Sequence, residues 1–141
     1  MSIAARDFFY VQQVEQHARR ALDECLQGEG LTAGQYMALS LVVHHEPVSS
    51  ADLARRARMT AQSMGEFIRT LEAKGLVEKR VDAGSRRSLA LTSTTVGRKL
   101  LVRSDAKVNE AERLFFDCLS GEENAHLRLL LSRLRKLRTP Q

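Results

Sequence analysis

The sequence lacks several features that define common classes of protein. It has no tryptophan and only 5% aromatic residues, so a single aromatic-lined active cleft is not expected. Its two cysteines, Cys25 and Cys118, lie far apart and match neither a metal-binding pair nor a disulfide framework. No apolar run approaches the roughly 18 residues of a transmembrane helix, and the N-terminus shows no signal peptide. We therefore expect a cytoplasmic protein that does not enter a membrane.

Signatures of catalysis and metal binding are also missing. The sequence shows no nucleophile–base pairing, glycine-rich phosphate loop or metal-ligand spacing. His44 and His45 are adjacent, and neighbouring helical residues point about 100° apart, so the two rings are poorly placed to share one metal ion. We predict no enzymatic activity, no cofactor and no metal site.

The sequence does carry an excess of positive charge. Its 22 lysines and arginines outnumber 17 acidic residues, and the formal net charge is +5. This balance favours a polyanionic partner, although many soluble proteins share it. The 141 residues and 43% hydrophobic content suit one globular domain, or one domain with helical extensions.

Residues 49–91 contain the most informative pattern. Ser49 and Thr60 each precede a helical segment and are expected N-caps, while Gly75 is expected to end the second helix. That second helix carries an apolar stripe at i, i+3, i+4 and i+7, formed by Met64, Phe67, Ile68 and Leu71. Residues 76–81 and 87–91 then alternate like a hairpin. A helix-turn-helix followed by a basic hairpin is a winged helix, so the expected partner is DNA.

Helices are expected on both sides of this segment. One runs over residues 7–27, and the next starts at a capping box formed by Thr32 and Gln35. After the hairpin, a long helix is expected from Thr92 or Ser93 to about residue 119, and a final helix follows a capping box at residues 120–123. The first and last helices have more apolar surface than one small domain can cover, which indicates pairing with a second copy.

Three motifs resemble the MarR family of bacterial transcription regulators: LEAKGLVEKR at residues 71–80, the hairpin from Asp82 to Arg87, and the LT pair at residues 91–92 followed by GRKLL. The resemblance extends from about residue 31 to the C-terminus. It implies a mainly α single domain with a small β-hairpin wing. In this fold residues 31–92 form the winged helix-turn-helix, and residues 1–30 and 93–141 form dimerisation helices. It also implies a homodimer that binds a pseudo-palindromic operator, most often as a ligand-responsive repressor.

Candidate DNA contacts lie on the recognition helix, on the helix before it and in the hairpin. Gln62 suits an adenine edge, Ser63 a base or a phosphate, and Glu66 a cytosine amino group; alternatively, Gln62 and Ser63 are exposed cap residues. Arginines before the recognition helix and Arg80 suit phosphates. The full set is Arg55, Arg56, Arg58, Ala61, Gln62, Ser63, Gly65, Glu66, Arg69, Arg80, Gly84, Ser85, Arg86 and Arg87.

The tip of the hairpin departs from the family pattern. Relatives usually carry Asp-x-Arg-Asp-x-Arg there; this sequence keeps Asp82 and Arg87 but has Gly84 and Ser85 in place of the inner pair. By resemblance, the outer pair braces the hairpin and the arginine that enters the minor groove is missing. Arg86 either replaces it or is a solvated turn charge.

The resemblance also implies a site for a small aromatic or phenolic effector between the dimerisation helices and the winged domain. Its candidate residues are His17, Tyr36, Met37 and Leu41, for which ordinary core and interface packing is the competing interpretation. Some relatives sense peroxide through a cysteine. Cys25 lies near a helix C-terminus, which disfavours a thiolate, so a packed thiol is expected for it and for Cys118.

One alternative function remains open at this stage. The protein could be a winged-helix interaction module that has lost DNA binding. The missing arginine at Gly84 supports this alternative, as does Glu66, where many relatives carry a basic residue.

Overall fold

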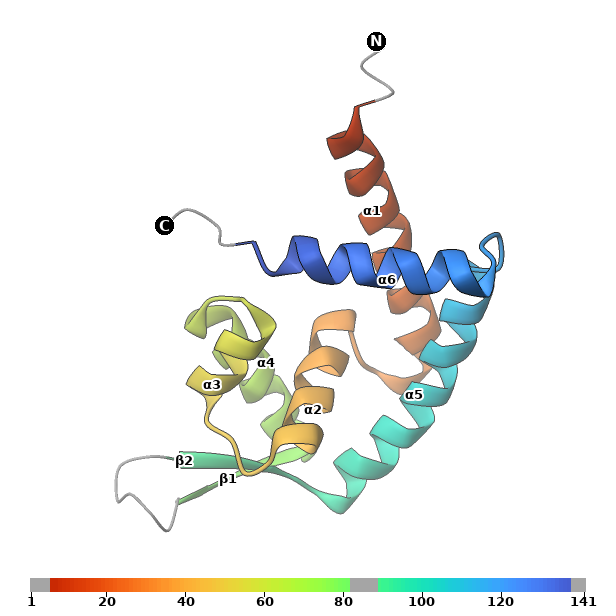
Figure 1. The fold of residues 1–141 in the computed structure, drawn as a ribbon. Coiled ribbons are helices and arrows are strands. Elements are labelled where there is room, and N and C mark those ends of the chain that lie inside the picture. Colours follow the sequence, from red (N-terminus) through yellow and green to blue (C-terminus); the bar gives the residue numbers. More distant parts are fainter. Residues whose placement is uncertain (1–5, 82–88, 138–141) are drawn as a thin grey trace.

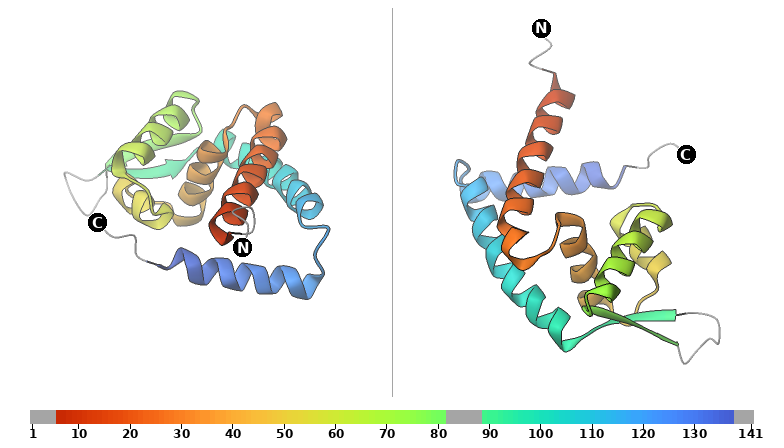
Figure 2. Two further views of the ribbon diagram at one scale, coloured as in Figure 1. Left: turned by 90° about the horizontal axis from the view of Figure 1, so that it is seen from above. Right: turned by 180° about the vertical axis from the view of Figure 1, so that it is seen from behind.

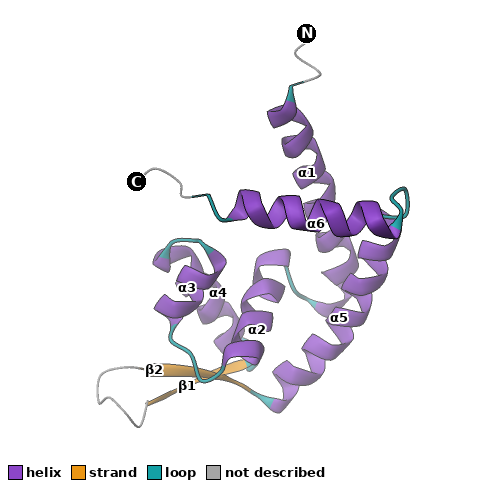
Figure 3. Ribbon diagram, viewed as in Figure 1, coloured by secondary structure: helices purple, strands orange, loops and turns teal. Residues whose placement is uncertain are grey.

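The computed structural model describes residues 6–81 and 89–137. These residues form a mainly helical structure with one two-stranded hairpin, which confirms the predicted fold class (Figures 1 and 3). The elements are α1 (Asp7–Leu26), the 3-10 turn η2 (Gln27–Glu29), α2 (Ala33–His45), α3 (Ser50–Ala57), α4 (Ala61–Ala73), β1 (Val77–Val81), β2 (Leu89–Ser93), α5 (Thr95–Phe115) and α6 (Gly121–Arg135).

Four of the predicted helix starts are confirmed. Thr32 and Ser120 each form a complete capping box with the residue three positions later. The hydroxyls of Ser49 and Thr60 accept hydrogen bonds from backbone N–H groups at the starts of α3 and α4. Such caps satisfy donors that the first turn of a helix leaves without partners, and each contributes about 1 kcal/mol.

The predicted start of the long helix is wrong. Ser93 pairs with Val77 in the hairpin, and its N–H donates to the Glu46 carboxylate at 2.9 Å, so both Thr92 and Ser93 belong to β2. The true N-cap is Thr94, whose Oγ1 accepts the Gly97 N–H at 3.0 Å. The helix also ends earlier than predicted, at Phe115.

The hairpin is joined to the segment between α2 and α3. β1 and β2 pair antiparallel, from Val77 opposite Ser93 to Val81 opposite Leu89. Val48 adds an isolated bridge to Leu91. The Val48 N–H donates to the Leu91 carbonyl at 3.2 Å, and the Leu91 N–H donates to the Val48 carbonyl at 2.7 Å. The base of the wing is therefore part of the folded domain.

A single apolar core holds the winged part together. Helix α1 packs along α5, and α2 packs against α4, β2 and α5. Figure 1 shows α3, α4 and the hairpin on one side of α2, with α1 and α5 on the other. Fully buried large apolar side chains come from α1, α2, α3, α4 and β2: Leu26, Leu39, Val42, Leu53, Met64, Ile68, Leu71 and Leu91.

The two terminal helices leave apolar side chains uncovered. Helix α6 turns sharply away from α5 and runs across the molecule, and none of its residues is buried (Figure 2). The exposed apolar side chains of α1 are Phe8, Phe9, Tyr10, Val11 and Val14, and those in and just after α6 are Leu129, Leu130, Leu131, Leu134 and Leu137. No helix within residues 6–81 and 89–137 is long and apolar enough to cross a membrane.

The two cysteines differ in their surroundings. Cys25 is half-buried, its Sγ donates to the Leu22 carbonyl at 3.2 Å, and burial raises the pKa of its thiol. The packed thiol predicted for Cys25 is confirmed. The same prediction for Cys118 is wrong for this chain by itself, because Cys118 follows the end of α5 and is exposed.

Candidate nucleic-acid interface

Helix α4 has a buried face and a polar face. Met64, Ile68 and Leu71 are buried, and Phe67 packs against the core from a half-buried position. The predicted contact residues lie on the rest of the helix: Ala61, Gln62, Glu66 and Arg69 are exposed, and Ser63 and Gly65 are half-buried. The buried face thus fixes α4 against the core, and the polar side chains of its N-terminal half are accessible to a ligand.

Ser63 belongs to the cap of α4 as well as to its polar face. Its N–H donates to Thr60 Oγ1 at 3.1 Å, and its Oγ accepts a hydrogen bond from the Thr60 hydroxyl at 2.9 Å. The Ser63 hydroxyl therefore has a structural partner and keeps one O–H donor for a base or a phosphate.

The Arg69 side chain lies beside Gly65 on the polar face. Its Nη1 would lie 3.5 Å from a Cβ atom at Gly65, an ordinary van der Waals contact, so the guanidinium folds back along the helix toward its N-terminus. Neither Arg69 nor Glu66 forms an ion pair within the part of the chain that the structure describes. Both charges are available to a partner.

The arginines of α3 share one carboxylate. Arg55 and Arg56 bond the two oxygens of Asp52 at 3.0 and 3.2 Å, and these guanidinium groups lower the Asp52 pKa. Both arginines are exposed. Asp52, Arg55 and Arg56 together give α3 a net charge of +1, and their hydrogen bonds hold the two arginine side chains in place on this helix.

Arg58 ends α3 in an unusual backbone conformation. Its φ of 55° lies in the left-handed region, and its N–H bonds carbonyls of the preceding turn. Its Nη1 lies 3.5 Å from the carbonyl oxygen of Leu137, just beyond α6. Arg58 is thus shared between the helix-turn-helix and the C-terminal helix, which sequence reasoning did not reveal.

The base of the hairpin carries two further ion pairs. Arg80 bonds Glu78 at 3.3 Å, and Lys79 bonds Glu72 of α4 at the same distance. The remaining wing candidates, Gly84, Ser85, Arg86 and Arg87, lie outside the described residues, as does Asp82.

The four predicted effector residues have different surroundings. Tyr36, Met37 and Leu41 pack against the core from α2, whereas His17 is exposed on α1. The Tyr36 hydroxyl donates to Asp105 Oδ1 of α5 at 2.5 Å. Burial and the neighbouring carboxylate raise the pKa of this phenol above its ordinary value. Tyr36 therefore links α2 to α5 as a neutral hydrogen-bond donor.

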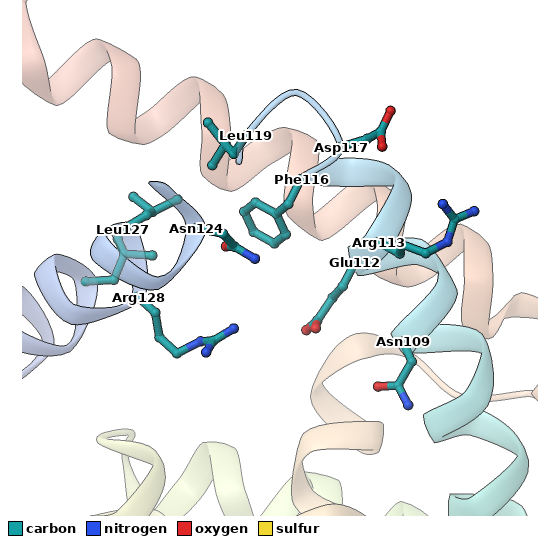
Figure 4. Close-up of a pocket in the computed structure, with 10 residues that line it drawn as sticks. Asn109, Glu112, Arg113, Phe116, Asp117, Leu119, Asn124, Leu127 and Arg128 are labelled. Atoms are coloured by element: carbon teal, nitrogen blue, oxygen red, sulfur yellow. The ribbon is translucent and has the colours of Figure 1, made fainter. Parts of the chain in front are cut away.

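A cavity of about 530 Å³ lies elsewhere, in the bend between α5 and α6. Figure 4 shows the Phe116 ring and the side chains of Glu112 and Arg128 directed into it, while Arg113 and Asp117 point away. Its lining residues are Asn109, Glu112, Arg113, Phe116, Asp117, Leu119, Asn124, Leu127, Arg128 and Leu131. An apolar wall beside a carboxylate, a guanidinium and two amides suits a small amphipathic molecule.

Sequence reasoning missed this cavity. One signal was present: Glu112 and Phe116 are four residues apart, as are Leu127 and Leu131, so each pair lies on one helical face. That the two faces meet depends on the angle at the turn between the helices, which helical periodicity does not specify.

Known proteins resemble this chain in sequence and in fold. A family model described as MarR family matches residues 29–88. The HTH-type transcriptional repressor Rv2887 of Mycobacterium tuberculosis is 32% identical over 116 residues, which cover 82% of this chain and 84% of the repressor.

Solved structures show the same likeness. A probable transcriptional regulator from Pseudomonas aeruginosa is 27% identical and superposes with a TM-score of 0.89, covering 94% of this chain and 99% of the regulator. Rv2887 in complex with DNA is 28% identical, with a TM-score of 0.75 and coverages of 92% and 98%. Rv2887 in complex with salicylic acid is 29% identical, with a TM-score of 0.74 and coverages of 95% and 99%.

Proposed function

Because the chain belongs to the MarR family of transcriptional regulators, we propose that it is a homodimeric repressor that binds a pseudo-palindromic operator in double-stranded DNA. The observation that carries this proposal is helix α4, whose apolar stripe is buried and whose N-terminal half presents exposed polar and charged side chains beside a hairpin. The relative Rv2887, which shares this fold, has been crystallised with DNA.

The proposed contacts divide into base and phosphate contacts. Gln62, Glu66 and Arg69 project from α4 and suit adenine, cytosine and guanine edges, respectively. Arg55 and Arg56 suit phosphates, which position a protein without reading sequence. Arg80 suits a phosphate on the wing side. Four hairpin candidates complete the proposal from the sequence: Gly84, Ser85, Arg86 and Arg87.

We assign the dimer interface to the terminal helices. Helices α1 and α6 expose apolar side chains that one copy leaves in water, and α6 has no buried residue. Association would remove this surface from water at about 25 cal/mol per Å². A two-fold dimer would then place two α4 helices in successive major grooves, about 34 Å apart.

We propose that a small aromatic effector regulates DNA binding. The Rv2887 structure with salicylic acid supports this class of ligand. The bend cavity, with Phe116 for a ring and Arg128 for a carboxylate, is an alternative to the site predicted around His17 and Tyr36. An effector changes operator affinity only by its difference in affinity between the two forms of the dimer.

The protein is proposed to work in the cytoplasm, where the bacterial chromosome lies, and to have no enzymatic activity. A gel-shift titration with the promoter region of its own gene at low salt tests the central point. A retarded complex that weakens steeply as salt increases is expected. Absence of retardation at micromolar protein would instead favour a winged module that binds another protein.

A further inference from the structure

Lys74 connects the end of the recognition helix to the segment that joins α1 to α2. It is the C-cap residue of α4, and its Nζ donates to the Gly30 carbonyl at 2.5 Å and to Gln35 Oε1 at 3.3 Å. The same Gln35 oxygen accepts the Thr32 N–H in the capping box of α2. One ammonium group therefore links α4 to the first turn of α2.

The segment that Lys74 contacts is itself held by the long helices. Asp23 near the end of α1 accepts the Ala33 N–H at 3.1 Å. Glu29 of η2 bonds Lys107 and Arg103 of α5 at 2.9 and 3.4 Å. Any movement of α1 against α5 therefore acts directly on the place where Lys74 is attached.

Two further contacts hold α4, one at its middle and one just after its C-terminal end. A Cβ atom at Gly34 would lie 2.3 Å from Cζ of Phe67, so the Phe67 ring of α4 lies directly against the α2 backbone. Thr94, the N-cap of α5, donates from its hydroxyl to the Gly75 carbonyl at 2.7 Å. The C-terminal end of α4 thus lies between α2 and α5, while its N-terminal end presents the proposed base contacts.

We propose that Lys74 is a positioning residue. It sets the tilt of the recognition helix α4 relative to the dimerisation helices, and therefore the distance between the two α4 helices of the dimer. This inference rests on the proposed function. The 13 residues of α4 span about 20 Å, so a tilt of about 5° about the Lys74 end moves the other end by about 2 Å. A shift of that size breaks hydrogen bonds to base edges.

The bonds of Lys74 are suited to geometry more than to stability. Its side chain is exposed, and exposed charged contacts contribute little to the free energy of unfolding. Removal of the ammonium group should therefore leave the fold intact and alter the placement of α4. This separates a positioning role from a purely structural one.

The test uses the full-length dimer and a duplex trimmed from the promoter fragment that it retards. Lys74→Met removes the ammonium group at similar length, Lys74→Arg keeps a donor, and Lys99→Met removes an exposed lysine from α5 as the matched control. Each protein is titrated against the native duplex and against duplexes with one base pair added or removed at the centre.

We expect Lys74→Met to bind the native duplex up to about fivefold more weakly, because the small free energy of the exposed Lys74 bonds sets the upper limit of the loss. It should also discriminate less than the parent protein between native and altered spacing. Its salt slope and melting temperature should be unchanged. Lys74→Arg should restore most of the spacing preference, and Lys99→Met should behave like the parent.

Several results would overturn the inference. Parent-like affinity and spacing preference in Lys74→Met would remove the positioning role. A salt slope lower by about 0.9 for each half-site would identify Lys74 as a phosphate contact instead. An equal loss of affinity on all duplexes would indicate a general defect. If the parent protein retards no DNA, the proposed function fails, which is a distinguishable outcome.

Discussion

Gly97 offers a sharp test of how the wing is joined to the long helix. It is buried in the first turn of α5, against the backbone that leads into β1. A Cβ atom there would lie 2.1 Å from the Leu76 carbonyl oxygen and 3.0 Å from its carbon. That oxygen also accepts the Thr94 N–H at 3.1 Å and lies 3.2 Å from the Thr94 hydroxyl, whose single proton is directed mainly at the nearer Gly75 carbonyl. Gly97→Ala must therefore move backbone, because no flexible side chain is present to yield.

The expected loss of stability can be worked from these contacts. Overpacking of this kind costs about 1–3 kcal/mol, and displacement of the Leu76 carbonyl weakens its hydrogen bond from the Thr94 N–H, which is worth about 1 kcal/mol. Alanine regains about 1 kcal/mol of helix propensity over glycine. The net loss is about 1–3 kcal/mol, which lowers the melting temperature by roughly 4–10 °C for a chain of this size.

Thermal and urea unfolding followed by circular dichroism measure this loss. All proteins must be compared at one concentration, because dimer stability depends on it. Gly121→Ala is the matched control, since a Cβ atom at this helix start meets nothing within 4 Å. A melting temperature of Gly97→Ala within about 2 °C of the parent would refute the reasoning, because a shift that small corresponds to less than about 1 kcal/mol.

Three further predictions concern single side chains. Lys107 and Arg103 lower the Glu29 pKa, so their stabilisation is complete above the unfolded value of about 4.3 and disappears as the pH falls below it. The urea midpoint of Glu29→Gln should therefore lie below that of the parent at pH 7, and the difference should shrink as the pH falls below the unfolded value; parallel curves would contradict this. Thr60→Ala removes the cap of α4 and should cost about 1 kcal/mol in urea unfolding, whereas an unchanged midpoint would show that the cap is dispensable. Arg55→Ala should lower the salt slope of operator binding by about 0.9 for each half-site contact that it makes, and an unchanged slope would exclude a phosphate contact.

Local chemistry in the sequence determined where most helices begin and which face of α4 is buried. A capping box such as Thr32 with Gln35 spans four residues, so its partners are adjacent in the chain whatever the rest of the fold does. The apolar stripe of α4 likewise depends on helical geometry alone. For this reason the winged helix-turn-helix was predictable from one sequence.

Tertiary structure decided the features that depend on distant partners. Ser93 is in a strand because Glu46 and Val77 bind it there, although its position before α5 resembles a cap. The bend cavity exists because α5 and α6 meet at a particular angle, and Lys74 reaches Gly30 across 44 residues of sequence. Periodicity describes one element at a time. The angles and contacts between elements arise only when all of them bury their apolar faces together.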